Sequence, residues 1–197
     1  MIFEATKLSC IRQQRILFSD VSFRLEKGGL LLVQGSNGSG KSSLLRILCG
    51  IATPYSGDIH WTPQHMHYIG HTNGIKLGLT VLENMRLFAA LIQQPHDETM
   101  PVLTQLELHP YQHRLAKHLS AGQKRRLALA KLLLFPKPLW ILDEPLTALD
   151  AHSQRIFLSA LETHLKNGGM AIVSSHHAFT LNDVKIQTLT LGEYSPC

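Results

Sequence analysis

Short apolar runs alternate with stretches of helical periodicity along most of the chain. The apolar runs are 21–25, 30–34, 67–70, 139–142 and 171–174. Continuous apolarity over so few residues is typical of strands that are buried on both faces of a parallel sheet. Helical periodicity lies between these runs, at 41–49, 80–93, 121–134 and 152–166. The alternation of strands and helices predicts an α/β fold.

One long span departs from this alternation. Residues 72–135 carry helical patterns and no strand-like run of their own. We therefore expect a helical subdomain at 72–135, inserted into an α/β core that is formed by 1–71 and 136–197.

The composition is that of a globular protein. The 197 residues are 44% hydrophobic and 17% charged, which predicts one or at most two compact domains. No apolar run approaches the roughly 20 residues of a membrane-spanning helix, and the amino terminus has no basic leader before an apolar block. We expect any membrane association to come through a partner. The net charge of +5 comes without a dense Lys/Arg run, so no nucleic-acid partner is expected.

Cysteines and histidines do not indicate a metal site. The three cysteines have no CxxC spacing, which predicts a reduced cytosolic chain with Cys10 and Cys49 as small apolar core residues. Two groups of histidines lack cysteine or acidic residues at ligand spacing, so no metal or haem site is expected there. These histidines are His65, His67, His71, His109, His113 and His118.

The sequence "GSNGSGKS" at 35–42 follows the apolar run 30–34 and opens a helical pattern, which is the context of a phosphate-binding loop. Glycines let the backbone N–H groups converge on phosphate oxygens at a helix amino terminus. Lys41 would contact the β- and γ-phosphates of ATP, and the Ser42 hydroxyl would bind Mg²⁺. The residues expected to bind nucleotide here are Gly35, Ser36, Asn37, Gly38, Ser39, Gly40, Lys41, Ser42 and Ser43.

Acidic and histidine residues follow two later apolar runs. In "LWILDEP", Asp143 is placed to hold Mg²⁺ and Glu144 to orient or deprotonate an attacking water. In "SSHH", His176 could reach the γ-phosphate as a neutral donor, whereas His177 is expected to face solvent. We therefore expect Glu144 and His176 to be catalytic.

The sequence "LSAGQ" at 119–123 precedes another helical pattern. A serine hydroxyl and backbone N–H groups at a helix amino terminus would form a second phosphate cradle. One nucleotide has no need of two cradles from a single chain, so we expect this one to serve the ATP of a second copy. Its residues are Leu119, Ser120, Ala121, Gly122 and Gln123.

These motifs together resemble the nucleotide-binding domain of an ABC transporter over the whole chain. "GSNGSGKSS" is similar to Walker A, "LWILDE" to Walker B, "LSAGQ" to the signature, and "ALD" at 148–150 to the D-loop, with His176 as the switch histidine. The resemblance implies a P-loop NTPase fold of the ABC ATPase type with a mixed sheet core, ATP and Mg²⁺ as ligands, and ATPase activity. It also implies a head-to-tail homodimer when ATP is bound, with Asp150 helping to bridge the two copies.

Three positions depart from the family pattern. The signature has Ala121 where glycine is commonest, and His71 stands where the family has a glutamine that contacts Mg²⁺ or the attacking water. A neutral histidine can offer a ring nitrogen in that place, so His71 is a catalytic candidate. Arg12 replaces the usual aromatic residue near adenine, and its guanidinium plane can stack on a purine.

Within the family, the short chain with "GSNGSGK", "IGH" and "LSAGQ" resembles the ATPase subunits of bacterial cytochrome c maturation, a haem exporter system. That resemblance implies a peripheral position on the cytoplasmic face of the inner membrane. It implies a membrane-embedded, CcmB-like permease as partner, with CcmC-like and CcmE-like proteins, and release of a haem-loaded chaperone. A soluble ABC ATPase of iron–sulphur cluster assembly and the ATPase of another small-molecule ABC transporter stay open as alternatives.

Overall fold

The structure is a computed structural model that describes residues 2–61, 65–91, 99–176, 179–181 and 184–192. The chain divides into two compact units. The first comprises Met1–Gly70, Lys137–Pro145 and Glu162–Cys197, and the second comprises His71–Pro136 and Leu146–Leu161. The expected insertion of a helical subdomain at 72–135 stays a prediction.

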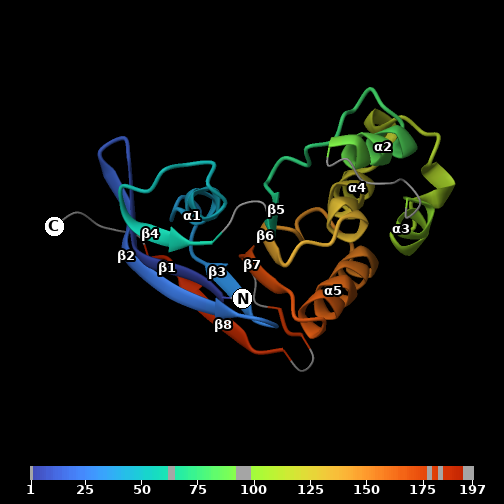
Figure 1. The fold of residues 1–197 in the computed structure, drawn as a ribbon. Coiled ribbons are helices and arrows are strands. Elements are labelled where there is room, and N and C mark those ends of the chain that lie inside the picture. The colour runs from blue at the N-terminus through green and yellow to red at the C-terminus, as the bar shows by residue number, and fades with distance from the viewer. Residues whose placement is uncertain (1, 62–64, 92–98, 177–178, 182–183, 193–197) are drawn as a thin grey trace. The chain divides into compact units, whose positions relative to one another are not determined.

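The first unit contains an antiparallel sheet in the order β2–β1–β4 (Figure 1). Its strands are β1 (Ile2–Arg12), β2 (Arg15–Glu26) and β4 (Ser56–His60). In β2, Phe23 and Leu25 are buried while Arg24 is exposed, so only one face of the strand is covered. The expectation that 21–25 forms a parallel strand buried on both faces is therefore wrong. Alternation of apolar and polar residues is typical of a sheet with one solvated face.

A second sheet of five strands is parallel throughout, in the order β5–β6–β7–β3–β8. The strands are β3 (Leu30–Gln34), β5 (Met66–Ile69), β6 (Leu139–Asp143), β7 (Met170–Ser174) and β8 (Ile186–Thr190). Strands β6 and β7 are buried at every residue, and β3 at all but Gln34, as their apolar runs predict. With helices packed against these sheets, the α/β fold is confirmed.

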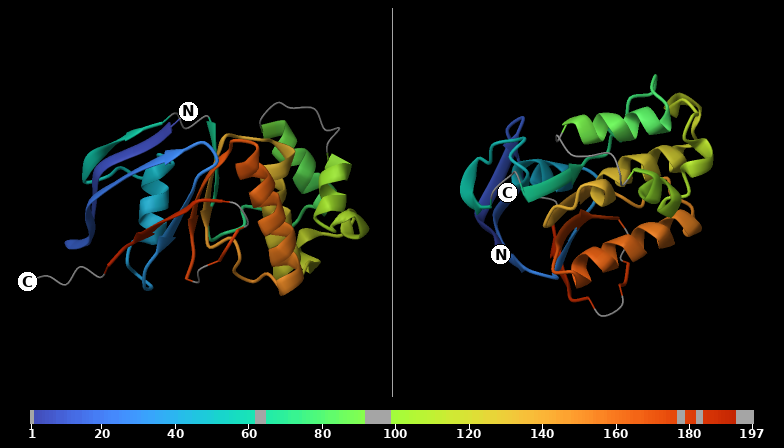
Figure 2. Two further views of the ribbon diagram at one scale, coloured as in Figure 1. Left: turned by 90° about the horizontal axis from the view of Figure 1, so that it is seen from below. Right: turned by 45° about the vertical axis from the view of Figure 1, so that its right-hand side comes forward.

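Helix α1 (Lys41–Leu48) packs between elements of both sheets (Figure 2). Its buried residues Leu44 and Leu45 share one core with Phe3 of β1 and Val33 of β3. Each large apolar side chain that is fully buried contributes about 1.5–3 kcal/mol, so this core fixes α1 and the loop before it. Cys10 is 5% exposed within this core, as expected, and the half-buried Cys49 packs against it.

The second unit is helical in its described residues (Figure 1). Its core is formed by side chains such as Met85, Leu103 and Leu127. None of the helices in the described part of the chain combines the length and apolar composition needed to cross a membrane. The helices are α2 (Val81–Leu91), α3 (Thr99–Gln105), η2 (His109–Tyr111), η3 (Ala116–His118), α4 (Ala121–Leu134) and α5 (Ala151–Lys166), of which α5 continues into the first unit.

Candidate functional site

The loop between β3 and α1 is folded tightly on glycines. Gly35, Gly38 and Gly40 have φ angles of 150°, 83° and 99°, which L side chains rarely adopt. A Cβ atom on Gly35 would lie 2.5 Å from Ser39 Oγ and 2.6 Å from the Leu191 carbonyl oxygen. The loop can therefore take this shape only with glycine at position 35.

Lys41, the first residue of α1, lies over this loop. Its side chain is buried, and Nζ donates hydrogen bonds to the carbonyl oxygens of Gly35 at 2.8 Å and Ser36 at 3.0 Å. An ammonium group has three donors, so Lys41 can also contact an anion without leaving the loop. The ammonium and the amino-terminal end of α1 both favour negative charge at this place.

The carboxyl end of β6 carries two carboxylates in different environments. Asp143 is 2% exposed, and its Oδ1 accepts a hydrogen bond from the Ser174 hydroxyl at 2.6 Å. The same hydroxyl oxygen accepts from the backbone N–H of Glu144 at 3.0 Å. Glu144 has a left-handed φ of 49°, a strained conformation that is typical of functional sites. One hydroxyl of β7 thus contacts both Asp143, the last residue of β6, and Glu144, the residue after it.

Glu144 also contacts the expected switch histidine. The distance from His176 Nε2 to Glu144 Oε1 is 2.8 Å, and the two side chains are 35% and 20% exposed. The structure therefore brings Asp143, Glu144 and His176 together at adjacent strand ends. The competing candidate His177 lies outside the described residues.

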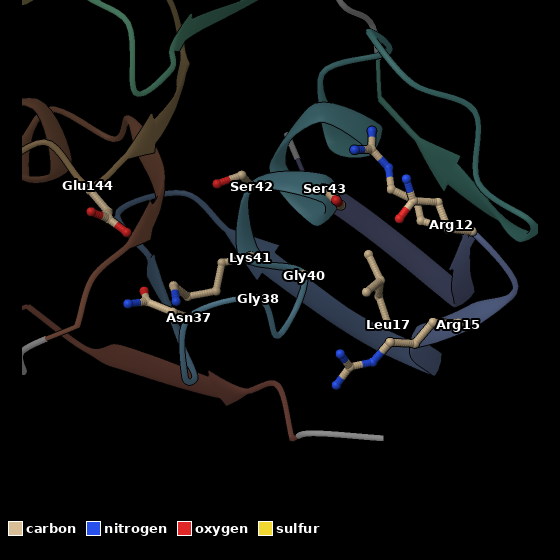
Figure 3. Close-up of a pocket in the computed structure, with 11 residues that line it drawn as sticks. Arg12, Arg15, Leu17, Asn37, Gly38, Gly40, Lys41, Ser42, Ser43 and Glu144 are labelled. Atoms are coloured by element: carbon tan, nitrogen blue, oxygen red, sulfur yellow. The ribbon is translucent and has the colours of Figure 1, made fainter. Parts of the chain in front are cut away.

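A cavity of about 500 Å³ is lined by the phosphate loop and by Glu144 (Figure 3). Glu144 stands at one end of this cavity and Arg12 at the other, with Lys41 and Ser42 between them. Arg15, on β2, also lines the cavity, on the far side of Leu17 from Arg12. The cationic side chains and the loop amides that line the cavity suit the binding of a polyanionic nucleotide. The carboxylate of Glu144 is placed in the same cavity, where it suits hydrolysis of that nucleotide.

The expected second cradle begins α4 in the second unit. Ser120 is the N-cap: its Oγ accepts from Gln123 N–H at 3.1 Å, and its N–H donates to Gln123 Oε1 at 2.9 Å. This capping box leaves the Ser120 hydroxyl proton free to donate. Residues Ala121 and Gly122 occupy the first helical turn, whose N–H groups have no intrahelical partner. Leu119 is buried and anchors the turn.

The expected dimer contact, Asp150, lies in the same unit, close to the signature. A Cβ atom on Gly122 would lie 3.2 Å from the Ala148 carbonyl oxygen, so the first turn of α4 lies against the segment before α5. Asp150 Oδ1 accepts from Ser153 N–H at 2.7 Å, and that bond lowers the pKa of Asp150. Asp150 thus caps α5 and stays ionised.

His71 begins the second unit and its side chain is exposed. The residues that follow are held in place: Arg125 of α4 donates to Asn73 Oδ1 at 3.2 Å. Buried Asn84 of α2 accepts from Lys76 N–H at 2.7 Å and donates to the Lys76 carbonyl oxygen at 3.0 Å. His71 therefore precedes a fixed loop, but the expected metal contact stays a prediction.

The chain matches a known protein family. The family model described as "ABC transporter" matches residues 18–147. The chain belongs to the ABC transporter family. It is 44% identical to the cytochrome c biogenesis ATP-binding export protein CcmA of Nitrosospira multiformis, over 95% of this chain and 98% of the relative. The CcmA proteins of Methylococcus capsulatus and Vibrio cholerae are 46% and 37% identical, over 88% and 98% of this chain and 90% and 99% of the relatives. Among ABC transporter proteins, this chain therefore groups with CcmA.

Solved structures of ATP-binding proteins of ABC transporters share the fold. An ATP-binding protein from Pyrococcus furiosus that is assigned to ABC transporters superposes with a TM-score of 0.83 at 24% identity, covering 97% of this chain and 98% of that one. The ATP-binding subunit of another ABC transporter gives a TM-score of 0.81 at 25% identity, with 89% and 80% covered. The expected α/β fold of the ABC ATPase type and the resemblance to this family are confirmed.

Sequence reasoning on this ABC ATPase missed Ser174, Arg15 and Leu17. Ser174 is the first serine of "SSHH", but its contacts with Asp143 and Glu144 arise only when β6 and β7 pair. Arg15 and Leu17 line the cavity because a two-residue turn returns β2 alongside β1. The left-handed residues of that turn, Gln13 and Gln14, are a poor sequence signal, since such turns favour asparagine and glycine.

We predict that Ser174→Ala lowers both stability and ATP hydrolysis. Loss of the hydroxyl leaves the buried Asp143 carboxylate without this donor and Glu144 N–H without this acceptor, which costs about 1–3 kcal/mol. Thermal unfolding and steady-state ATPase rates measure the two effects. The control is Ser22→Ala, which removes one exposed hydroxyl that accepts from Lys7 N–H. Equal behaviour of the two variants would contradict the role given to Ser174.

Proposed function

We propose that this chain is the ATP-hydrolysing subunit of a bacterial ABC transporter complex, the CcmAB complex of cytochrome c maturation. In this proposal, ATP hydrolysis is coupled to the release of a haem-loaded chaperone. Family membership and the names of the relatives support it. The observation that carries the hydrolytic part is that Glu144 lines the same cavity as the phosphate loop.

ATP would lie along this cavity. The amides of the loop and Lys41 would hold the phosphates, and the first turn of α1, with Ser43, would face them. Arg12 would hold the base, since a guanidinium plane can stack on a purine where the family has an aromatic ring. The exposed position of Arg12 at the end of the cavity supports this role.

The residues present suit Mg²⁺. This ion prefers oxygen ligands. Ser42, which lines the cavity, offers a hydroxyl oxygen, and Asp143, which is buried at a strand end, offers carboxylate oxygens. Ser42 and Asp143 would hold Mg²⁺, with His71 as a further contact to the ion or to the attacking water. When bound, the ion neutralises charge on the phosphates.

Hydrolysis would depend on Glu144 and His176. The Glu144 carboxylate would orient the attacking water and accept its proton, because it is anchored through its own N–H and aimed into the cavity. His176 would donate a hydrogen bond to the γ-phosphate. The contact of 2.8 Å between Glu144 and His176 keeps the imidazole beside the carboxylate until nucleotide is bound.

The signature would act on the nucleotide of a second copy. In this ATP-bound homodimer, Leu119, Ser120, Ala121, Gly122 and Gln123 of one copy would face the phosphates held by the other, with Asp150 at the contact between copies. The free hydroxyl proton of Ser120 and the N–H groups of the first turn of α4 suit an anion.

The partners follow from the same proposal. A membrane-embedded, CcmB-like permease would hold the chain at the cytoplasmic face of the inner membrane, as a peripheral subunit. CcmC-like and CcmE-like proteins would complete the assembly. Co-purification from membranes tests this part: a soluble iron–sulphur scaffold in place of a permease would contradict it.

Glu144→Gln should separate hydrolysis from binding. Removal of the base lowers the rate of hydrolysis by about 10²–10⁴-fold, while Lys41 and the loop amides still bind ATP. An ATP-bound dimer should therefore accumulate, which size-exclusion chromatography with and without MgATP would detect. Glu26→Gln, at an exposed residue of β2, is the control. Wild-type turnover in Glu144→Gln would exclude Glu144 as the base.

His71→Gln tests the place where this chain departs from its family. Histidine gains a proton within the range of pH 5–8, whereas glutamine keeps an uncharged oxygen at every pH. If His71 contacts the ion or the water, wild-type hydrolysis should fall on the acid side of neutrality, and His71→Gln should reduce that fall. His176 is common to both proteins, so the comparison isolates His71. Superimposable pH–rate profiles would contradict the contact.

A further inference from the structure

Helix α3 ends in a turn that favours glycine but contains glutamate. Leu108 N–H donates to the Leu103 carbonyl oxygen at 2.7 Å, and Glu107 N–H donates to that of Thr104 at 3.0 Å. This pair of bonds is the Schellman motif, which places Glu107 in the left-handed region, with a φ of 53°. Glycine is the preferred residue there, so local structure does not account for a glutamate.

The backbone of Glu107 is firmly held. Its neighbours Leu106 and Leu108 are 3% and 0% exposed and belong to the core of the second unit. The glutamate side chain is itself half exposed. The turn therefore presents a carboxylate from a fixed point at the surface of the unit.

This carboxylate joins two helices. Oε2 of Glu107 accepts from Arg126 Nη1 at 3.1 Å, and Oε1 lies 2.7 Å from His152 Nε2. The pKa of Glu107 is lowered, chiefly by the hydrogen bond from His152 and further by Arg126, so the carboxylate is ionised. Arg126 is three residues beyond Gln123 on α4, and His152 is two residues beyond Asp150 on α5.

Helix α4 begins at the signature, and helix α5 begins after the D-loop. In the proposed function, both of these segments act on the second copy. Close approach of Gly122 to the Ala148 carbonyl oxygen sets the two segments against each other at one point. The bonds of Glu107 add a second point of attachment, at Arg126 and His152, four residues further along the chain from Gly122 and Ala148. A second point of attachment restricts rotation of one segment relative to the other, which a single contact leaves open.

We propose that Glu107 is a positioning residue that holds the D-loop in a fixed orientation to the signature, so that Asp150 and Ser120 reach the second copy together. The inference rests on the proposed function, in which both segments act in trans. It is distinct from a role in stability, because exposed ion pairs contribute little to folding and glycine would suit the backbone better.

Glu107→Gly gives the sharpest test, because it relieves the backbone and removes the carboxylate. In the full chain, we expect the melting temperature and the affinity of single copies for a fluorescent ATP analogue to stay at wild-type values or above. The kcat for ATP should fall by about 10- to 100-fold, as expected when reacting groups are misplaced. In the Glu144→Gln background, the ATP-dependent dimer should form only at higher protein concentrations.

Two further variants control this experiment. Glu83→Gln alters another exposed carboxylate of the same unit, which accepts from the N–H and the hydroxyl of Thr80 at the start of α2, and it should leave kcat unchanged. His152→Gln keeps a donor for Glu107 and should retain most of the activity, whereas His152→Ala should lose it.

Wild-type kcat in Glu107→Gly would overturn the inference. A fall in kcat that only follows a lower melting temperature would overturn it as well, since Glu107 would then be structural. Absence of ATP hydrolysis by the wild-type chain would instead contradict the proposed function, and the inference with it.

Discussion

The hydrolytic site depends on two hydrogen bonds made by the hydroxyl group of Ser174. Parallel strands β6 and β7 end side by side, and a buried carboxylate at such an end is costly unless it is hydrogen-bonded. Ser174 donates to Asp143 and accepts from Glu144 N–H, so one side chain hydrogen-bonds to the buried carboxylate and to the strained backbone of the next residue. The direction of Glu144 into the cavity follows from this arrangement.

The phosphate loop is constrained by its glycines and by the core beneath α1. Its glycines let the backbone fold where a Cβ atom would collide, and the core beneath α1 holds the helix end in place. Lys41 uses the carbonyl oxygens of Gly35 and Ser36 as partners, which keeps a cation within the loop. The loop and the strand ends thus build one cavity from elements that are far apart in the sequence.

Features with a local cause could be predicted from the sequence. The phosphate loop depends on glycines at fixed offsets, and β3, β6 and β7 are apolar because both their faces are covered. Strands β1, β4 and β8 were missed, and the sequences of β4 and β8, SGDIH and IQTLT, have few apolar residues. The roles of Ser174 and Glu107 could not be predicted, since each depends on contacts across elements, and a glutamate in a left-handed turn contradicts local preference.

In the proposed function, each ATP site is completed by the signature of a second copy. The most direct measurement is ATP hydrolysis by a mixture of two variants that are each inactive alone, Lys41→Ala and Ser120→Arg. In a mixed dimer, the intact phosphate loop of the Ser120→Arg copy would meet the intact signature of the Lys41→Ala copy. Mixing the two variants should therefore restore hydrolysis. If each chain forms its whole site alone, the mixture stays inactive, and that result would contradict the claim.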